Sequence, residues 1–260
     1  MRIAAGLACL GLLTGCGFTE PSGAAVHSAS PLRWGPDIAD DFHALPRVAA
    51  DTRQARAING FLDSLDVRDR EERSTCLAES PENVEWGRFI EAPMTGPRFV
   101  SLIVTIGYYC GGAHPYWTQT HYTFDLHTGQ QVDWSVLLPD DMSRPLQEPR
   151  YSWPALLASP SLTAWFAERA LAGMDERGRD DCGYVYGLEG RKYWSLAVWP
   201  DAKEGGLGLQ PVGLAHAETG CLVSATIPLA ELRRRGAAPE LTDAIEAAQA
   251  AESWHGPRPE

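Results

Sequence analysis

A glycine-rich turn holds the histidine with the clearest potential for chemistry. His114 follows Gly111-Gly112-Ala113 and precedes Pro115. The glycines permit positive φ angles and close backbone approach, and the proline ring fixes the exit of the chain. We interpret His114 as a structural residue whose two ring nitrogens hydrogen-bond exposed backbone groups. The alternative is a histidine that contacts a ligand or a metal ion.

Aromatic side chains flank this turn on both sides: Tyr108, Tyr109, Tyr116, Trp117 and Tyr122. If they are exposed, they form a platform suited to sugar rings or to a protein partner, and if they point inward, they belong to the core. We favour the core. The candidate ligand contacts still come from this region and the strand after it: His114, Tyr109, Tyr116, Trp117 and Asp125.

Three further side chains raise the question of a metal site. His121, Asp125 and His127 have the same parity, so one strand would place them on one face. The chain has no CxxC, CxxH or HExxH motif, however, and we predict no metal and no cofactor. We expect Asp125 instead to bind backbone amides of the turn that follows it, in an Asx-type arrangement.

Acid catalysis is the other chemistry to weigh. Asp140-Asp141 and Asp180-Asp181 are paired acids, and a glycosidase needs two carboxylates that converge in space. We interpret both pairs as solvated loop charges. The serine nucleophile motifs GxSxG and SxxK are absent, and His216 is as consistent with the core as with the surface. We therefore predict that the protein is not an enzyme.

The first residues are typical of a secreted lipoprotein. Arg2 precedes an uncharged run at 3–13, which makes only about 16 Å of helix, too short for a hydrocarbon core of roughly 30 Å. Leu13-Thr14-Gly15-Cys16 resembles the bacterial lipobox, whose cysteine is lipidated. Gly17 in place of Asp favours the outer membrane facing the periplasm, and several acyl chains anchor a protein stably. An ordinary signal peptide cut elsewhere is the alternative.

Charge restricts the partners. The formal net charge of the 260-residue chain is −12. Nucleic acid is excluded because its binders need a basic footprint, and adhesion to anionic lipid heads by charge is disfavoured. An acidic surface favours a basic partner, although plain solubility is the simpler explanation.

The cysteines indicate an oxidising compartment. With Cys16 acylated, four remain after the signal peptide: Cys76, Cys110, Cys182 and Cys221. Four cysteines allow three pairings. We favour Cys76–Cys110 and Cys182–Cys221, because both close local units, and each would stabilise the fold by roughly 4 kcal/mol in the chain-entropy model. A metal site is the competing interpretation.

Periodicity predicts alternating blocks of helix and strand. The predicted helices lie at 51–77, 161–172, 228–235 and 239–252, with a single helical turn at 135–138. The predicted strands lie at 84–90, 99–109, 119–126, 130–134, 183–187, 192–199, 206–210 and 221–227. Turns are expected at 92–98 and 127–129, a loop at 139–160, and a solvated or frayed helix end at 66–75. The order indicates an α+β fold, mostly antiparallel sheet with a helix packed on one face and two disulfides.

Residues 108–137 carry a family resemblance. Tyr108-Tyr109-Cys110-Gly111-Gly112-Ala113-His114-Pro115 is followed by Tyr122-Thr123-Phe124-Asp125-Leu126 and then Thr128-Gly129. A later segment, Thr226-Ile227-Pro228-Leu229-Ala230-Glu231-Leu232, closes the pattern. This sequence pattern resembles that of a cell-envelope domain family of largely unknown function. Its members include the extracellular half of a lysozyme-sensing anti-sigma factor and the N-terminal region of a peptidoglycan N-acetylmuramic acid deacetylase.

The resemblance covers about residues 45–235 and implies an α+β envelope domain that binds peptidoglycan or a lysozyme-like protein. The four cysteines and the loop at 139–160 depart from the family pattern. Neither deacetylase nor anti-sigma activity is expected here, because no catalytic domain or sigma-binding segment accompanies the domain. The expected organisation is a signal peptide at 1–15, lipidated Cys16 with a tether to residue 44, the domain at 45–235 and a helical tail at 236–260.

Three functions remain open. The leading hypothesis is a non-enzymatic module, anchored in membrane lipid through its acyl groups, that binds peptidoglycan or a lysozyme-like protein. The second is a cell-wall hydrolase, which would need carboxylates or histidines clustered in a cleft. The third is a structural lipoprotein with no soluble ligand.

Overall fold

The computed structural model describes residues 30–79, 85–111, 114–144, 156–192 and 194–256. The predicted signal peptide, Cys16 and the first part of the tether lie outside the described residues. Gly112, Ala113 and much of the predicted loop at 139–160 also lie outside them.

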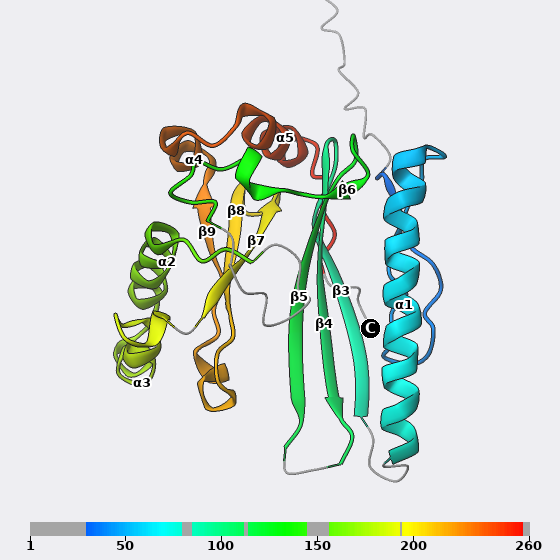
Figure 1. The fold of residues 1–260 in the computed structure, drawn as a ribbon, viewed down its shortest axis with the longest axis horizontal. Coiled ribbons are helices and arrows are strands. Elements are labelled where there is room, and N and C mark those ends of the chain that lie inside the picture. The colour runs from blue at the N-terminus through cyan, green and yellow to red at the C-terminus, as the bar shows by residue number, and fades with distance from the viewer. Residues whose placement is uncertain (1–29, 80–84, 112–113, 145–155, 193, 257–260) are drawn as a thin grey trace, which may run out of the picture.

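Two antiparallel sheets form the centre of the molecule (Figure 1). The first runs in chain order: β3 (Glu85–Thr95), β4 (Phe99–Tyr109), β5 (Tyr116–Asp125) and β6 (Gln130–Gln131). The second also runs in chain order: β7 (Ser195–Asp201), β8 (Gly206–Val212) and β9 (Ala225–Pro228). A separate short pair consists of β1 (Leu32–Arg33) and β2 (Arg47–Val48).

Helices cover the outer sides of this pair of sheets. The α-helices among the described residues are α1 (Arg53–Glu79), α2 (Pro160–Gly173), α3 (Glu176–Tyr186), α4 (Leu229–Arg235) and α5 (Pro239–Ala250). The 3₁₀ helices are η1 (Trp134–Val136), η2 (Gly190–Lys192) and η3 (His216–Cys221). In Figure 1, α1 lies along one face of the β3–β4–β5 sheet, and the second sheet lies on the other side with α2 to α5 around it. The predicted α+β class with a helix on one face is confirmed.

A stripe of apolar residues holds α1 on the sheet. Ala55, Ile58, Leu62 and Leu65 recur at helical spacing and are buried, so they face one side of the helix. The predicted solvated end at 66–75 is wrong in part. The helix continues to Glu79, and Asp66 and Asp69 are buried, because both lie on or beside the inward face and have a buried cationic partner.

Alternate residues of β4 serve two different cores. Val100, Leu102 and Val104 pack with the apolar stripe of α1. Phe99 belongs to the core of the second sheet, and the Ser101 hydroxyl donates to the Pro200 carbonyl at 2.8 Å. The alternation that predicted a strand at 99–109 therefore positions β4 between α1 and the second sheet.

One predicted strand and one predicted turn need correction. Residues 183–187 are not a strand, because they lie in and just after α3, where Cys182, Val185 and Tyr186 are buried at helical spacing. The Asp175 side chain caps this helix by accepting from the Gly178 N–H at 2.7 Å. The turn predicted at 92–98 is shorter, since β3 continues to Thr95, and Ala92 and Thr95 donate to the carbonyls of His255 and Ser253 near the C-terminus.

Other element boundaries shift by a few residues. β5 begins at Tyr116 instead of residue 119, β6 stops at Gln131, and β9 begins at Ala225 because Cys221 ends η3. The helical turn expected at 135–138 is η1. The turn at 127–129 is confirmed, with Gly129 in the left-handed region at a φ of 75°.

Both favoured disulfides are present. Cys76–Cys110 joins the end of α1 to the end of β4, and Cys182–Cys221 joins α3 to η3. Their Cα–Cα distances are 4.9 and 5.5 Å, which suit a disulfide. Each bond therefore ties a helix to an element of a different layer.

Segments expected to flank the domain are part of its folded body. Leu32 and Phe42, within the expected tether, are buried, and Leu241 and Ile245 of α5, within the expected tail, are fully buried. Among the described residues, no helix combines the length and the apolar character needed to cross a membrane.

Candidate ligand-binding surface

The aromatic residues around the β4–β5 connection form an exposed surface at one end of the first sheet. Strand register places Tyr108 opposite Tyr116, and Gly107 opposite Trp117. Tyr116 is 44% exposed and Trp117 is 41% exposed. The favoured prediction that the cluster is core is therefore wrong for these two residues, because hollows separate the start of β5 from α1 on one side and from β8 on the other. It is confirmed for Tyr122, which is buried beneath α1.

His114 joins this surface through ring contacts. Its imidazole stacks on that of His216 at a centroid distance of 5.7 Å, and the Tyr116 ring lies 6.5 Å from that of His216, again roughly parallel to it. His216 begins η3, which connects β8 to β9 and lies at the same end of the molecule as the β4–β5 connection (Figure 1). The backbone-bonding role expected for His114 is not seen, since its ring forms no hydrogen bond within the part of the chain that the structure describes.

An acidic groove of about 650 Å³ lies on one side of the exposed Tyr116 and Trp117. Its charged lining consists of Asp40, Asp41 and Glu85 with a single guanidinium, Arg73. Its aromatic lining includes Trp86, Phe89 and Tyr108. Burial raises the pKa of the Tyr108 phenol above its ordinary value, and the nearby Tyr116 and Glu72 add to the effect. The groove therefore combines negative charge with aromatic faces.

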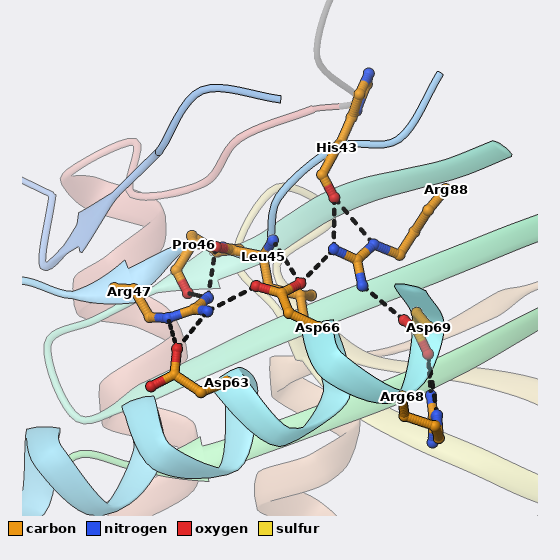
Figure 2. Close-up of polar contacts among 9 residues, drawn as sticks. All are labelled: His43, Leu45, Pro46, Arg47, Asp63, Asp66, Arg68, Asp69 and Arg88. Atoms are coloured by element: carbon orange, nitrogen blue, oxygen red, sulfur yellow. Dashed lines mark hydrogen bonds and ion pairs between the residues drawn. The ribbon is translucent and has the colours of Figure 1, made fainter. Parts of the chain in front are cut away.

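A buried ion network holds the wall of this groove in place (Figure 2). The Arg88 side chain is fully buried on β3 and forms ion pairs with Asp66 and Asp69 of α1. Its Nε and Nη2 also donate to the His43 carbonyl at 2.9 and 2.7 Å. The Arg88 backbone N–H donates to the Asp41 carbonyl at 2.6 Å. One arginine thus positions α1, β3 and the segment that carries the acidic groove residues.

Further charges extend the network toward solvent. Asp66 also accepts from Arg47 Nη2 at 2.6 Å, and Asp69 accepts from Arg68 Nη2 at 2.7 Å. Each buried carboxylate therefore bonds one buried and one partly exposed arginine, as Figure 2 shows. Two carboxylates facing one fully buried guanidinium leave one negative charge unbalanced, so the outer arginines both offset that charge and satisfy the remaining carboxylate oxygens.

A small neutral cleft lies on the other side of the exposed aromatic pair. It measures about 80 Å³ and runs between the start of β5 and the segment from β8 to η3. Gln210 Nε2 donates to Gln119 Oε1 at 2.7 Å, and Gln119 Nε2 donates to Thr105 Oγ1 at 3.1 Å. The cleft therefore has an amide floor that bridges the two sheets.

Two other predicted site residues lie elsewhere. Asp125 ends the ten-residue strand β5, roughly 30 Å from Tyr116 at 3.3 Å per residue. It accepts from the His127 N–H at 2.7 Å, so the expected Asx-type role is confirmed. Tyr109 is half-buried at the end of β4, opposite Glu85 in the strand register.

The open alternative of a metal site at His121, Asp125 and His127 is not realised. His121 is buried between the sheets, where its ring stacks on Trp199 at 4.3 Å, whereas His127 is exposed in the turn. Within the described ranges, no three His, Cys, Asp or Glu side chains gather in a way that would hold a metal ion.

The paired acids also lie apart from the aromatic surface. The Asp141 carbonyl accepts from Ser161 Oγ at 2.6 Å beside the start of α2, and Asp181 lies 3.6 Å from Arg177 on α3. Arg88 is an important residue that the sequence interpretation did not single out, and the contact of His216 with His114 was not predicted. A signal existed for Arg88, because it alternates with Trp86 and Ile90 on the buried side of its strand.

The arrangement defines a disulfide-linked α+β domain with two antiparallel sheets and an exposed aromatic end. No family model and no curated protein matches the sequence. A crystal structure of a member of the DUF3298 family from Bacteroides fragilis is similar to this chain, with a TM-score of 0.44 and 11% sequence identity. The match covers 77% of this chain and 75% of that chain.

Proposed function

We propose that this protein is a non-enzymatic binding module of the cell envelope, anchored by acyl groups on Cys16, whose aromatic end binds a basic protein. The observation that carries the proposal is the acidic groove beside Tyr116 and Trp117. Lysozyme-like enzymes are the sharpest candidate partner, because they are cationic and act on the cell wall outside the cytosol.

The chemistry of the groove suits a protruding lysine or arginine. Three carboxylates face one guanidinium, so the groove attracts positive charge. The exposed faces of Tyr116 and Trp117 add cation–π attraction, which is strongest over an indole ring. The net charge of −12 would steer a cationic partner toward the protein before contact.

The test compares two variants with the same change in net charge. Asp40→Asn, Asp41→Asn and Glu85→Gln together remove the three carboxylate charges of the groove and leave Arg73. Glu176→Gln, Asp180→Asn and Asp181→Asn neutralise exposed acids of α3, which lies across the molecule from α1 (Figure 1). Binding of lysozyme is measured at low and at moderate salt.

We expect the groove variant to bind lysozyme about ten-fold more weakly and with less dependence on salt, because short-range pairs are lost. The α3 variant should keep most of the affinity. Equal losses of affinity in both variants would show that lysozyme is attracted only by the overall negative charge. If lysozyme were not retained at either salt concentration, it would not be a partner.

Peptidoglycan is the second candidate ligand. The specific observation in its favour is the neutral cleft with an amide floor on the opposite side of the same aromatic pair. Aromatic faces combined with planar amides are suited to sugar rings and their substituents.

A further inference from the structure

We propose that the neutral cleft is a binding site for the acetamido group of a 2-acetamido sugar, with the sugar ring lying outside on Trp117. The inference rests on the proposed role as a binding module, but it concerns a different site from the acidic groove. The argument uses the size, the polarity and the rim of the cleft.

Size comes first. The cleft measures about 80 Å³, well below the roughly 300–1,000 Å³ of pockets that enclose a whole small ligand. It therefore accepts a substituent, while the body of the ligand remains at the surface. An acetamido group has four heavy atoms and projects from its sugar ring, so it matches this restriction.

The floor offers amide hydrogen bonds in both directions. A primary amide has two N–H donors and one acceptor oxygen. Gln119 uses its oxygen on Gln210 and one N–H on Thr105, and Gln210 uses one N–H on Gln119. Each glutamine therefore keeps one N–H, and Gln210 keeps its carbonyl oxygen. These groups complement the C=O and the N–H of a secondary amide.

The remaining lining excludes charge and accepts a methyl group. Pro211, Val212, Leu214 and Leu222 provide apolar surface next to the amide floor. The cleft lining, as the structure describes it, contains no Asp, Glu, Lys or Arg. An ammonium or a phosphate would lose its hydration there without a counter-charge, whereas a neutral acetamido group would not.

The rim supplies the surface for the sugar ring. Trp117 and Tyr116 line the cleft and are both about two-fifths exposed, so their faces remain available beside its mouth. Large aromatic faces pack against the apolar C–H face of a pyranose ring, so removal of the aromatic side chain removes the contact. A sugar ring on Trp117 would direct its acetamido group at the amide floor.

The experiment uses the purified full-length protein and three trisaccharides of equal length. They are the β-1,4-linked trimers of N-acetylglucosamine, glucosamine and glucose, and binding is measured by calorimetry without any protein partner. We expect the N-acetylated trimer to bind about ten-fold more tightly than either of the others, because only it fills the cleft and pairs with the amides.

Matched variants locate the site. Trp117→Ala should weaken binding of the N-acetylated trimer about ten-fold, whereas Tyr184→Ala, at an aromatic residue of α3 that is 65% exposed, should have no effect. Gln210→Leu should abolish the preference for the acetylated trimer. Because Gln210 bridges the sheets, Thr219→Met on η3 serves as a second test, since it fills the cleft without changing a strand.

Equal binding of all three trimers, or equal effects of Trp117→Ala and Tyr184→Ala, would overturn the inference. Failure of the N-acetylated trimer to bind, while lysozyme is still retained by the acidic groove, would overturn the cleft site and leave the proposed function standing. Binding of the N-acetylated trimer without retention of lysozyme would overturn the proposed binding of a basic protein and leave the cleft site standing.

Discussion

The two halves of the molecule differ in the kind of interaction found in their interiors. In the half formed by α1 and the β3–β4–β5 sheet, a fully buried arginine and two buried carboxylates lie among the apolar residues. In the half formed by β7, β8 and β9 with α2 to α5, the centre is apolar, and Leu207, Ile227 and Leu241 have no exposed surface. The charged half carries the acidic groove, and the neutral cleft lies where the halves meet.

This difference shows what the buried ions contribute. Buried ion pairs are weak evidence for stability, because desolvation offsets much of their attraction. Arg88, however, bonds α1 and the segment carrying Asp41 at once, and hydrophobic contacts lack that directionality. We infer that the network sets the position of the groove wall, whereas the apolar half provides most of the stability.

The strongest way to test this contrast is to remove the central cation. Arg88→Met would leave Asp66 and Asp69 buried without their shared guanidinium. We expect a loss of about 3–5 kcal/mol in the free energy of unfolding, the usual cost of breaking a buried ion pair. Urea unfolding followed by circular dichroism measures it.

A companion variant separates positioning from stability. Arg88→Met combined with Asp66→Leu and Asp69→Leu removes every buried charge of the network, and much of the lost stability should return. Binding of lysozyme should not return with it, because the groove wall loses its polar attachment. A loss below about 1 kcal/mol for Arg88→Met alone would show that the network is a minor feature.

The apolar half should respond to a different change. Leu207→Ala removes buried side-chain atoms from the core of the second sheet, and we expect a loss of about 3 kcal/mol, measured in the same unfolding experiment. Leu188→Ala, at a position that is 69% exposed, should stay within about 0.5 kcal/mol of the parent. If Leu207→Ala also weakened ligand binding in the folded protein, the separation between the two halves would not hold.

The elements that the sequence predicted well are those with long, regular patterns. The apolar stripe of α1 and the alternation of β4 each extend over many residues, so the helical period in one and the two-residue period in the other are unambiguous. The disulfide pairing could be predicted because each bond closes a local unit. Cys76 and Cys110 are 34 residues apart, and Cys182 and Cys221 are 39 residues apart. Such features depend little on distant parts of the chain.

The features that the sequence did not reveal depend on distant contacts. The burial of Asp66 and Asp69 follows from Arg88, and the contact of His114 with His216 joins loops that are about a hundred residues apart. In α3, the residues Tyr184, Val185 and Tyr186 favour a strand by propensity, but the Asp175 cap and the burial of Cys182 favour a helix. Tertiary contacts decided each of these cases.

The boundary between the halves provides the most subtle test, through His121. Its ring is buried against Trp199, and neither ring nitrogen has a hydrogen-bond partner among the described residues. Burial lowers the pKa of His121 to about 3. Between these two pKa values, His121 is protonated in the unfolded chain, whose ordinary histidine pKa is near 6.5, and neutral in the folded protein. The stability from His121 is therefore complete above about pH 6.5 and is lost as the pH falls toward 3.

The expected loss between pH 7 and pH 5 is about 2 kcal/mol in the free energy of unfolding. His121→Phe keeps an aromatic ring on Trp199 and cannot take up a proton, so its stability should fall by about 2 kcal/mol less than that of the parent over the same interval. His127→Gln, in the exposed turn, is the matched control and should retain the slope of the parent. If His121→Phe showed that same slope, the imidazole would be hydrated and protonated in the folded protein. The contact between the two halves would then be wet and polar, in contrast to the apolar centre of the second sheet.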